Sequence, residues 1–337
     1  MKVQVDPWRK PTLIGLIVFL GVFAAAGPLL AQNRYALQVA TLILLFAYLA
    51  ASWNILSGYG GQFSFGHAAF FGLGAYTSTV LFVKFGISPW VGMVAAGVLS
   101  ALLGLFIGLA CFRSGLRGAY FALATLAFAE ILRVVFVNWD WVGRSQGLLI
   151  QLVGDQPLLF QFGGRLPYYY VALGLLALVS GVTLALERHR LGYELRAIRA
   201  NELAAAVLGV DVFRAKMWAI GLSAFFTGIG GTFYAQYFYY IEPFQVFGVG
   251  MSVDILLPAI IGGAGTPLGP IVGSAVLVLL GEVTRTFFRG FPGADLMVFG
   301  VILILVVLFM PSGIIGTLRQ GHGPFRVVRK LVKAAWQ

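Results

Sequence analysis

The stretch SGYGGQFSFGHAAFFGLGAY, residues 57–76, decides how this chain folds. It contains six glycines, two serines, a glutamine and a histidine, although the sequence on both sides is apolar enough to lie in lipid. Glycine weakens a helix, and polar groups in hydrocarbon are costly unless protein or water satisfies them. The stretch therefore predicts a helix that is broken inside a membrane protein.

The composition of the whole chain agrees with a membrane location. Of its 337 residues, 60% are hydrophobic and 10% are charged, and the mean hydropathy is +0.91. A soluble domain carries about 25% charged residues. Apolar runs recur steadily, and no stretch is polar enough for a separate soluble domain. We therefore expect one polytopic membrane domain over residues 1–337.

Apolar runs of roughly 20 residues predict about ten transmembrane helices in an all-α bundle. The predicted spans lie near residues 11–31, 36–56, 67–83, 88–112, 118–137, 167–186, 216–240, 248–262, 270–288 and 295–316. If the N-terminus is inside, most Lys and Arg residues fall on the inner side, which predicts cytoplasmic N- and C-termini. The count changes if a Gly-rich segment only dips into the membrane.

The net charge of +11 and the N-terminal run each have two interpretations. The charge would suit nucleic acid, but an excess of basic residues on the cytoplasmic face explains it more simply, so we predict no nucleic-acid partner. The basic N-terminus followed by an apolar run resembles a signal peptide. It lacks a clear cleavage site, and we interpret it as a retained first span.

Two connections are long. Residues 138–166 are expected outside, as a folded cap with an amphipathic element. Residues 187–215 are expected inside and form the most charged piece of the chain. Within them, Asn201 suits a helix N-cap, Glu202 suits the positive helix N-terminus, and Gly209 suits a helix stop. A short cytosolic helix is predicted, with a solvated linker as the alternative.

Two Gly-rich stretches suggest an internal repeat. GGQFSFGHAAFFG (60–72) and GGAGTPLGPIVGS (262–274) both follow a span that arrives inside, and both lead into an apolar helix. Membrane transporters often carry broken helices at matching places of two repeats.

Several kinds of chemistry are not predicted. The chain has no GxxxxGKS or GxxxxGKT sequence, so it has no phosphate-binding loop of its own. Three scattered His residues and the single Cys111 indicate neither a metal site nor a disulfide framework. Ser64 and His67 have a spacing that invites a hydrolase interpretation, but no GxSxG sequence surrounds Ser64.

Ionisable residues inside predicted spans are candidates for a polar path. Glu130 and Arg133 stand at i and i+3 on one helix, where they can pair. The two residues either form a structural ion pair or line a polar path. Asp254 lies in a short span with Pro258 four residues later, and we expect it to face the path or a gate. Its alternative is a salt bridge to another subunit.

Four motifs in order resemble the LivM/LivH-type permeases of branched-chain amino-acid ABC transporters. They are GYGGQFSFGHAAFFGLGAYTSTVL, the segment from LGYELRAIRANELAAAVLG to GGTFYA, IIGGAGTPLGPIVGSAVL and GVILILVVLFMPSGIIG. The resemblance covers roughly residues 36–318, and the long outer loop looks closer to the LivM type. ABC permeases share an EAA-type loop that contacts the ATPase. Ala204, Ala205 and Gly209 fit that pattern, whereas Leu203 stands where its Glu would be.

The resemblance implies a non-enzymatic permease subunit of a bacterial inner-membrane importer. A periplasmic binding protein would deliver branched-chain amino acids, a second, LivH-like permease would complete the path, and two separate ATPase subunits would bind the ATP. No cofactor is expected on this chain. A urea, amide or broad-range amino-acid permease is the nearest alternative, and an ion-coupled secondary transporter is a further one.

The resemblance and the residues together assign two sets of positions. The residues assigned to the ATPase-coupling loop are Arg196, Arg199, Asn201, Glu202, Ala204, Ala205 and Gly209. The residues assigned to the translocation path or to a subunit seam are Gly58, Gly60, Gly61, Gln62, Ser64, Gly66, His67, Asp254, Gly262 and Gly263. Close packing between helices is the alternative role for the glycines.

Overall fold

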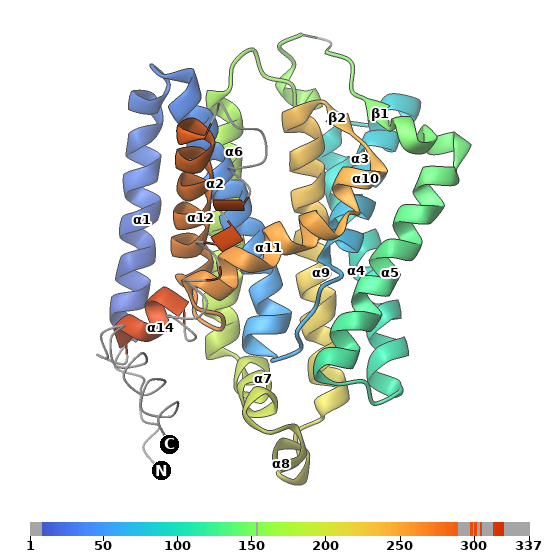
Figure 1. Ribbon diagram of the computed structural model, residues 1–337, viewed down its shortest axis with the longest axis vertical. Coiled ribbons are helices and arrows are strands. Elements are labelled where there is room, and N and C mark those ends of the chain that lie inside the picture. The colour runs from blue at the N-terminus through green and yellow to red at the C-terminus, as the bar shows by residue number, and fades with distance from the viewer. Residues whose placement is uncertain are drawn as a thin grey trace.

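Long apolar helices make up most of the chain in the computed structural model (Figure 1). The structure describes residues 9–152, 154–288, 297, 298, 300, 301, 304 and 313–319. Two short helices, α7 (Arg190–Ala200) and α8 (Glu202–Val207), lie at one end of the bundle, which we call the α8 end. The segment between α5 (Gly118–Asn138) and α6 (Leu166–Arg188) covers the opposite end, which we call the cap end.

The chain passes back and forth between these two ends. The long helices are α1 (Arg9–Leu30), α2 (Arg34–Trp53), α3 (His67–Phe85), α4 (Pro89–Arg113), α5 (Gly118–Asn138), α6 (Leu166–Arg188), α9 (Val212–Phe238), α11 (Val249–Gly262) and α12 (Gly269–Phe287). The shorter ones are α7 (Arg190–Ala200), α8 (Glu202–Val207), α10 (Pro243–Val246) and α14 (Gly313–Arg319).

Within the described ranges, eight stretches are long and apolar enough to cross a membrane. They coincide with eight of the predicted spans and confirm the all-α membrane fold. The predicted span 216–240 is helical as α9, but Gly, Ser, Thr and Tyr dilute its hydropathy, so it is not one of the eight. The predicted span 295–316 lies largely outside the described residues.

Helix α9 forms the centre of one half of the bundle, where it packs against α3 and α4. Its buried residues include many small ones, which let the helix backbones approach closely. A methyl group added at Gly74 of α3 would overlap the backbone of Gly228 on α9, and one at Gly228 would overlap Ser100 of α4. In the other half, α2 packs against α6, α11 and α12.

The cap end is folded, as predicted for residues 138–166. It consists of three single 3-10 turns, η2 (Asp140–Val142), η3 (Arg144–Gln146) and η4 (Pro157–Leu159), and the strand β1 (Leu148–Leu149). Strand β1 pairs antiparallel with β2 (Tyr240–Ile241), which follows α9. Phe160, which directly follows η4 within the cap, is fully buried. The expected amphipathic element is thus replaced, over the described part of the cap, by short turns and a strand.

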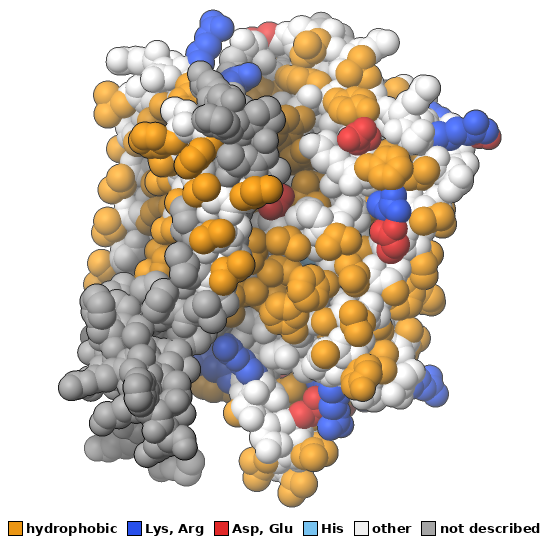
Figure 2. Space-filling model, in the orientation of Figure 1, with side chains coloured by type: hydrophobic (Ala, Val, Ile, Leu, Met, Phe, Trp, Pro, Cys, Tyr) orange, Lys and Arg blue, Asp and Glu red, His pale blue; other side chains and the backbone are white. Residues whose placement is uncertain are grey.

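The surface of the bundle is apolar over its middle. Figure 2 shows hydrophobic side chains spread over the central part of the visible face, while most Lys and Arg side chains lie toward its two ends. Large apolar residues on several helices are exposed, among them Val94, Leu102 and Phe106 on α4. This pattern suits a protein whose middle is surrounded by lipid.

Candidate functional site

The first Gly-rich stretch interrupts a helix at the α8 end. Helix α2 continues as one π-helical element, η1 (Asn54–Tyr59), and residues 60–66 are irregular before α3 begins at His67. Figure 1 shows this irregular stretch rising between the helices from the α8 end. We call residues 54–66 the first break.

Side chains satisfy much of the backbone that the first break exposes. The Ser57 hydroxyl donates to the carbonyl of Gln62 (2.8 Å), and the Trp53 indole N–H donates to the carbonyl of Ser64 (2.8 Å). The Oε1 atom of Gln62 is buried and has no hydrogen-bond partner among the described residues. An unpaired buried amide oxygen of this kind needs water or another polar ligand.

His67 is buried and connects the first break to α9 through hydrogen bonds. Its Nδ1 lies 3.0 Å from Oγ of Ser64, and its Nε2 lies 2.8 Å from Oγ of Ser223. The Ser223 hydroxyl donates in turn to the carbonyl of Ser52 (2.7 Å). Both ring nitrogens are therefore occupied by hydroxyls, which leaves neither for the carboxylate that a catalytic triad requires. The hydrolase interpretation has no support.

The second Gly-rich stretch separates α11 from α12, and it touches the first break. The amide of Gly265 donates to Oδ1 of Asn54 (2.7 Å), and Nδ2 of Asn54 donates to the carbonyl of Thr266 (3.1 Å). We call residues 263–268 the second break. Two stretches about 200 residues apart in the sequence thus meet at the α8 end, which their similar local pattern alone could not predict.

The predicted glycines have different neighbours within the chain. A methyl group at Gly66 would overlap the Thr125 carbonyl on α5, and one at Gly58 would lie 2.7 Å from the Gly265 nitrogen. One at Gly262 would overlap Gly269. Gly60 lies against the backbone of Leu56. Close packing inside this chain therefore explains these four glycines, without reference to another subunit.

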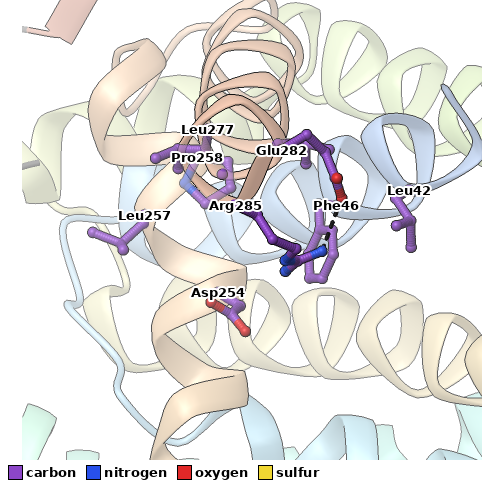
Figure 3. Close-up of a pocket in the computed structure, with 10 residues that line it drawn as sticks. Leu42, Phe46, Asp254, Leu257, Pro258, Leu277, Glu282 and Arg285 are labelled. Atoms are coloured by element: carbon purple, nitrogen blue, oxygen red, sulfur yellow. Dashed lines mark hydrogen bonds and ion pairs between the residues drawn. The ribbon is translucent and has the colours of Figure 1, made fainter. Parts of the chain in front are cut away.

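Asp254 lies in a pocket of about 270 Å³ between α2, α11 and α12 (Figure 3). Its carboxylate has no hydrogen bond or salt bridge within the described part of the chain. Pro258 also lacks the N–H that would otherwise bond the carbonyl of Asp254. Arg285 and Glu282 of α12 line the same pocket and pair with each other at 3.1 Å (Figure 3). Its apolar wall includes Leu42, Phe46, Leu257 and Leu277.

The predicted pair of Glu130 and Arg133 forms on α5. The Nε of Arg133 donates to both carboxylate oxygens of Glu130, at 3.0 and 2.9 Å. The guanidinium carbon of Arg133 also lies 4.9 Å from the centre of the Phe244 ring, which belongs to α10. The pair is distant in sequence from both breaks, and no hydrogen bond among the described residues connects it to either one.

The α7–α8 connection has the cap and stop that the sequence indicates. Oδ1 of Asn201 accepts a hydrogen bond from the Ala204 amide (3.1 Å), and Gly209 has a φ of +88° just after α8. The two alanines assigned to the coupling loop differ in exposure. Ala204 is exposed, but Ala205 is buried.

Three larger apolar side chains are exposed on α8 and at its end. Leu203 is 65% exposed, Val207 is 88% exposed and Leu208 is 82% exposed. Figure 1 shows α8 projecting below the rest of the bundle. The sequence prediction missed these residues, although apolar residues within the most charged loop of the chain were an available signal.

Glu202 is directed back toward the bundle. Its carboxylate lies 2.7 Å from the ammonium of Lys216 at the start of α9, and 3.3 Å from the guanidinium of Arg117. Glu202 therefore fixes α8 to the bundle, in addition to any effect on the helix N-terminus. Lys216, which the sequence prediction did not single out, is buried in this pair.

The two predicted arginines of the loop also point in different directions. Arg196 on α7 donates through Nη2 to the carbonyl of Glu187 (3.1 Å), in the last turn of α6. Arg199 reaches the bundle instead, where Nη1 donates to the carbonyl of Gly58. No group of three or more metal-ligating side chains occurs within the described ranges.

Known proteins similar to this chain are transport permeases. The family described as the permease component of the branched-chain amino acid transport system matches residues 35–307. The high-affinity branched-chain amino acid permease protein LivM of Escherichia coli K12 is 29% identical over 324 residues, covering 89% of this chain and 74% of LivM. The corresponding LivH protein is 24% identical and covers 82% of this chain and 92% of LivH. The guanosine ABC transporter permease protein NupQ of Bacillus subtilis 168 is 24% identical, covering 83% and 93%.

Proposed function

Because the chain belongs to the branched-chain amino acid permease family, we propose that it forms half of a path that carries branched-chain amino acids across the bacterial inner membrane. It is a permease subunit of an ABC importer and not an enzyme, and the ATP is hydrolysed by partner subunits. Family membership also decides against an ion-coupled secondary transporter. A LivH-like second permease and a binding protein complete the proposed assembly.

The observation that carries the proposal is the apolar surface of α8. Leu203, Val207 and Leu208 project from the end of the bundle that carries α7, and Glu202 holds their helix in place. Exposed apolar groups that are fixed on a rigid support typically mark a protein interface. In an ABC importer the permease binds the ATPase subunit through such a surface. The α8 end therefore faces the cytosol in this proposal.

The proposed path runs past the two breaks and the pocket of Asp254. Irregular backbone at membrane depth is tolerated where protein buries it or where it lines a water-filled cavity. The unpaired Oε1 of Gln62 and the unpaired carboxylate of Asp254 are the polar groups that favour the second alternative. The outlet lies near the breaks at the α8 end, and the N- and C-termini are cytoplasmic.

The chemistry of the Asp254 pocket favours a zwitterionic substrate over one without charged groups. Asp254 suits an ammonium group, and the apolar wall suits a branched aliphatic side chain. Arg285 uses Nη1 to pair with Glu282, and its remaining N–H groups suit a carboxylate. Guanosine, the substrate named for the NupQ relative, and urea carry neither an ammonium nor a carboxylate group at neutral pH. These are therefore the alternatives that a substrate test must include.

ATP-driven uptake by the reconstituted complex tests the substrate. The permease pair, the ATPases and the binding protein are assembled in proteoliposomes, and uptake of leucine, isoleucine and valine is compared with uptake of urea and guanosine. We expect uptake of the three amino acids only. Uptake of guanosine or urea without uptake of the amino acids would contradict the substrate assignment and leave the permease role intact.

Co-purification of the ATPase tests the α8 surface. Leu208→Asp places a charge on that surface, and we expect the variant to lose the ATPase while it stays in the membrane. Leu158→Asp is the matched control, because Leu158 is 83% exposed on the cap end. It should retain the ATPase. Equal retention by both variants would remove the support that α8 gives to the proposal.

A further inference from the structure

Arg199 joins the α7–α8 connection to both breaks. Its Nη1 donates to the carbonyl of Gly58 in the first break, and both terminal nitrogens lie 3.4 Å from the carbonyl of Ala264 in the second. We propose that Arg199 is the positioning residue that transmits movement of the ATPase-bound loop to the two breaks of the path. This inference rests on the proposed function of α8 as an ATPase contact.

The breaks are shaped around the Arg199 side chain. Gly61 has a φ of +66°, and a methyl group there would lie 3.1 Å from the Cα of Arg199. Gly265 has a φ of +81°, and a methyl group there would overlap the guanidinium. L-residues with a side chain rarely adopt such φ values. Glycine at both positions thus allows the close approach of a long cation from another part of the chain.

Packing of α7 and the end of α6 holds Arg199 next to the first break. Leu195 and Ile198 on α7 are buried, and the Tyr59 hydroxyl of the first break donates to Oε1 of Glu187 (3.0 Å) in the last turn of α6. Asn201, two residues after Arg199, caps α8. A displacement of α8 is therefore carried through one short connection to the guanidinium, with no flexible linker between them.

The chemistry of the contact suits a bond that forms and breaks during transport. An arginine guanidinium is a planar fork, which can reach two carbonyl oxygens of different segments at once, whereas a lysine ammonium is a single point charge. Arg199 is also partly open to solvent. Its charge therefore remains hydrated when it leaves the two carbonyls, so separation does not strand a bare buried ion. Asn54 still connects the breaks when Arg199 has moved away.

The reconstituted complex tests this inference with Arg199→Gln and Arg199→Lys. Hydrogen bonds to charged groups contribute enough to alter a coupled equilibrium by roughly tenfold or more. We expect both variants to bind the ATPase normally and to retain basal ATP hydrolysis. Uptake, and the stimulation of hydrolysis by the loaded binding protein, should fall by about tenfold in the Gln variant. The Arg199→Lys variant should retain more uptake and more stimulated hydrolysis than Arg199→Gln.

Hydrogen exchange gives a readout that is independent of transport. Amides of residues 58–66 and 263–268 should exchange faster in Arg199→Gln than in the unchanged complex. The control is Arg188→Gln, because Arg188 is an exposed arginine at the end of α6 with no hydrogen bond or ion pair among the described residues. It should match the unchanged complex in uptake, ATP hydrolysis and exchange.

The outcomes separate this inference from the proposed function. Normal coupling and normal exchange in Arg199→Gln would overturn the role of Arg199. Loss of the ATPase in both Arg199 variants would also overturn it, in favour of a purely structural role. If the ATPase fails to bind the unchanged chain, or if Leu208→Asp retains it fully, the proposed function of α8 is contradicted instead.

Discussion

The ammonium nitrogen of Lys216 lies 2.7 Å from Oε2 of Glu202, and only 4% of the Lys216 side chain is exposed. This pair connects α8 to the start of α9. The second partner of Glu202, Arg117, is more than half exposed and contributes little by comparison. This partly buried ion pair therefore helps to fix the position of the exposed apolar surface of α8.

Glu202→Ala should destabilise the protein because it leaves the Lys216 ammonium buried without its partner. Breaking a buried pair in this way costs about 3–5 kcal/mol, and the lower end applies here because Glu202 is itself partly exposed. Thermal unfolding in detergent measures the effect. The double variant Glu202→Gln with Lys216→Met removes both charges and should recover most of the loss. Equal midpoints for the single and double variants would contradict this account.

Gly66→Ala should destabilise the chain through a contact within it. The φ of Gly66 is −99°, which alanine can adopt, so the obstacle is overlap of the added methyl group with Thr125 on α5. Overpacking of this kind costs about 1–3 kcal/mol. Gly174→Ala on α6 is the control, because no atom lies within 4 Å of the added methyl group. It should be neutral or stabilising by about 0.5–1 kcal/mol. Similar melting temperatures for the two variants would refute the packing role of Gly66.

Ser223→Ala tests the structural role of His67. The change leaves Nε2 of His67 without its partner in a fully buried site, at a cost of about 1–3 kcal/mol. Ser78→Ala is the control, because the buried Ser78 hydroxyl has no partner among the described residues and loses no bond. Detergent-solubilised protein should therefore melt at a lower temperature only for Ser223→Ala. An equal shift in the two variants would mean that the hydrogen bond between His67 and Ser223 adds nothing to stability.

The breaks themselves were predictable because their signal is local. A run of glycines and polar side chains between apolar segments indicates interrupted helices whatever surrounds it, and both Gly-rich stretches are irregular where the pattern indicates. The cap of α8 was predictable for the same reason, since Asn201 bonds an amide three residues away. A short range of sequence was enough in each case.

The partners of the breaks were not predictable because they come from distant parts of the chain. No local pattern connects Arg199 with Ala264, or Asn54 with Gly265. The direction of each α8 side chain depends on how the whole helix sits against α9, so the sequence pattern that placed Ala205 in the coupling loop could not show that its side chain is buried. The interior position of α9 explains why its polar composition is tolerated despite a hydropathy below that of the other spans.

Cysteine labelling tests the orientation of the bundle. In a Cys111→Ser background, single cysteines replace Val207 at the α8 end and Leu158 at the cap end, both of which are strongly exposed. A membrane-impermeant maleimide added to intact spheroplasts should label only the cysteine at position 158, and membrane disruption should expose position 207. Labelling of both positions from outside would contradict the cytosolic assignment of the α8 end.

Asp254→Asn tests whether the carboxylate of Asp254 faces the path. Because Asp254 has no hydrogen bond or salt bridge among the described residues, the change breaks no bond within them and should leave folding intact. If the carboxylate binds the substrate ammonium, uptake of leucine should fall roughly tenfold or more, since hydrogen bonds to charged groups contribute about 1.5–3 kcal/mol. Asp254→Glu keeps the charge and should retain part of the uptake. The alternative is a salt bridge to the second permease subunit, and it predicts that Asp254→Asn loses that subunit on co-purification. Full uptake by an intact Asp254→Asn complex would exclude both roles, so uptake and assembly are measured in the same preparations.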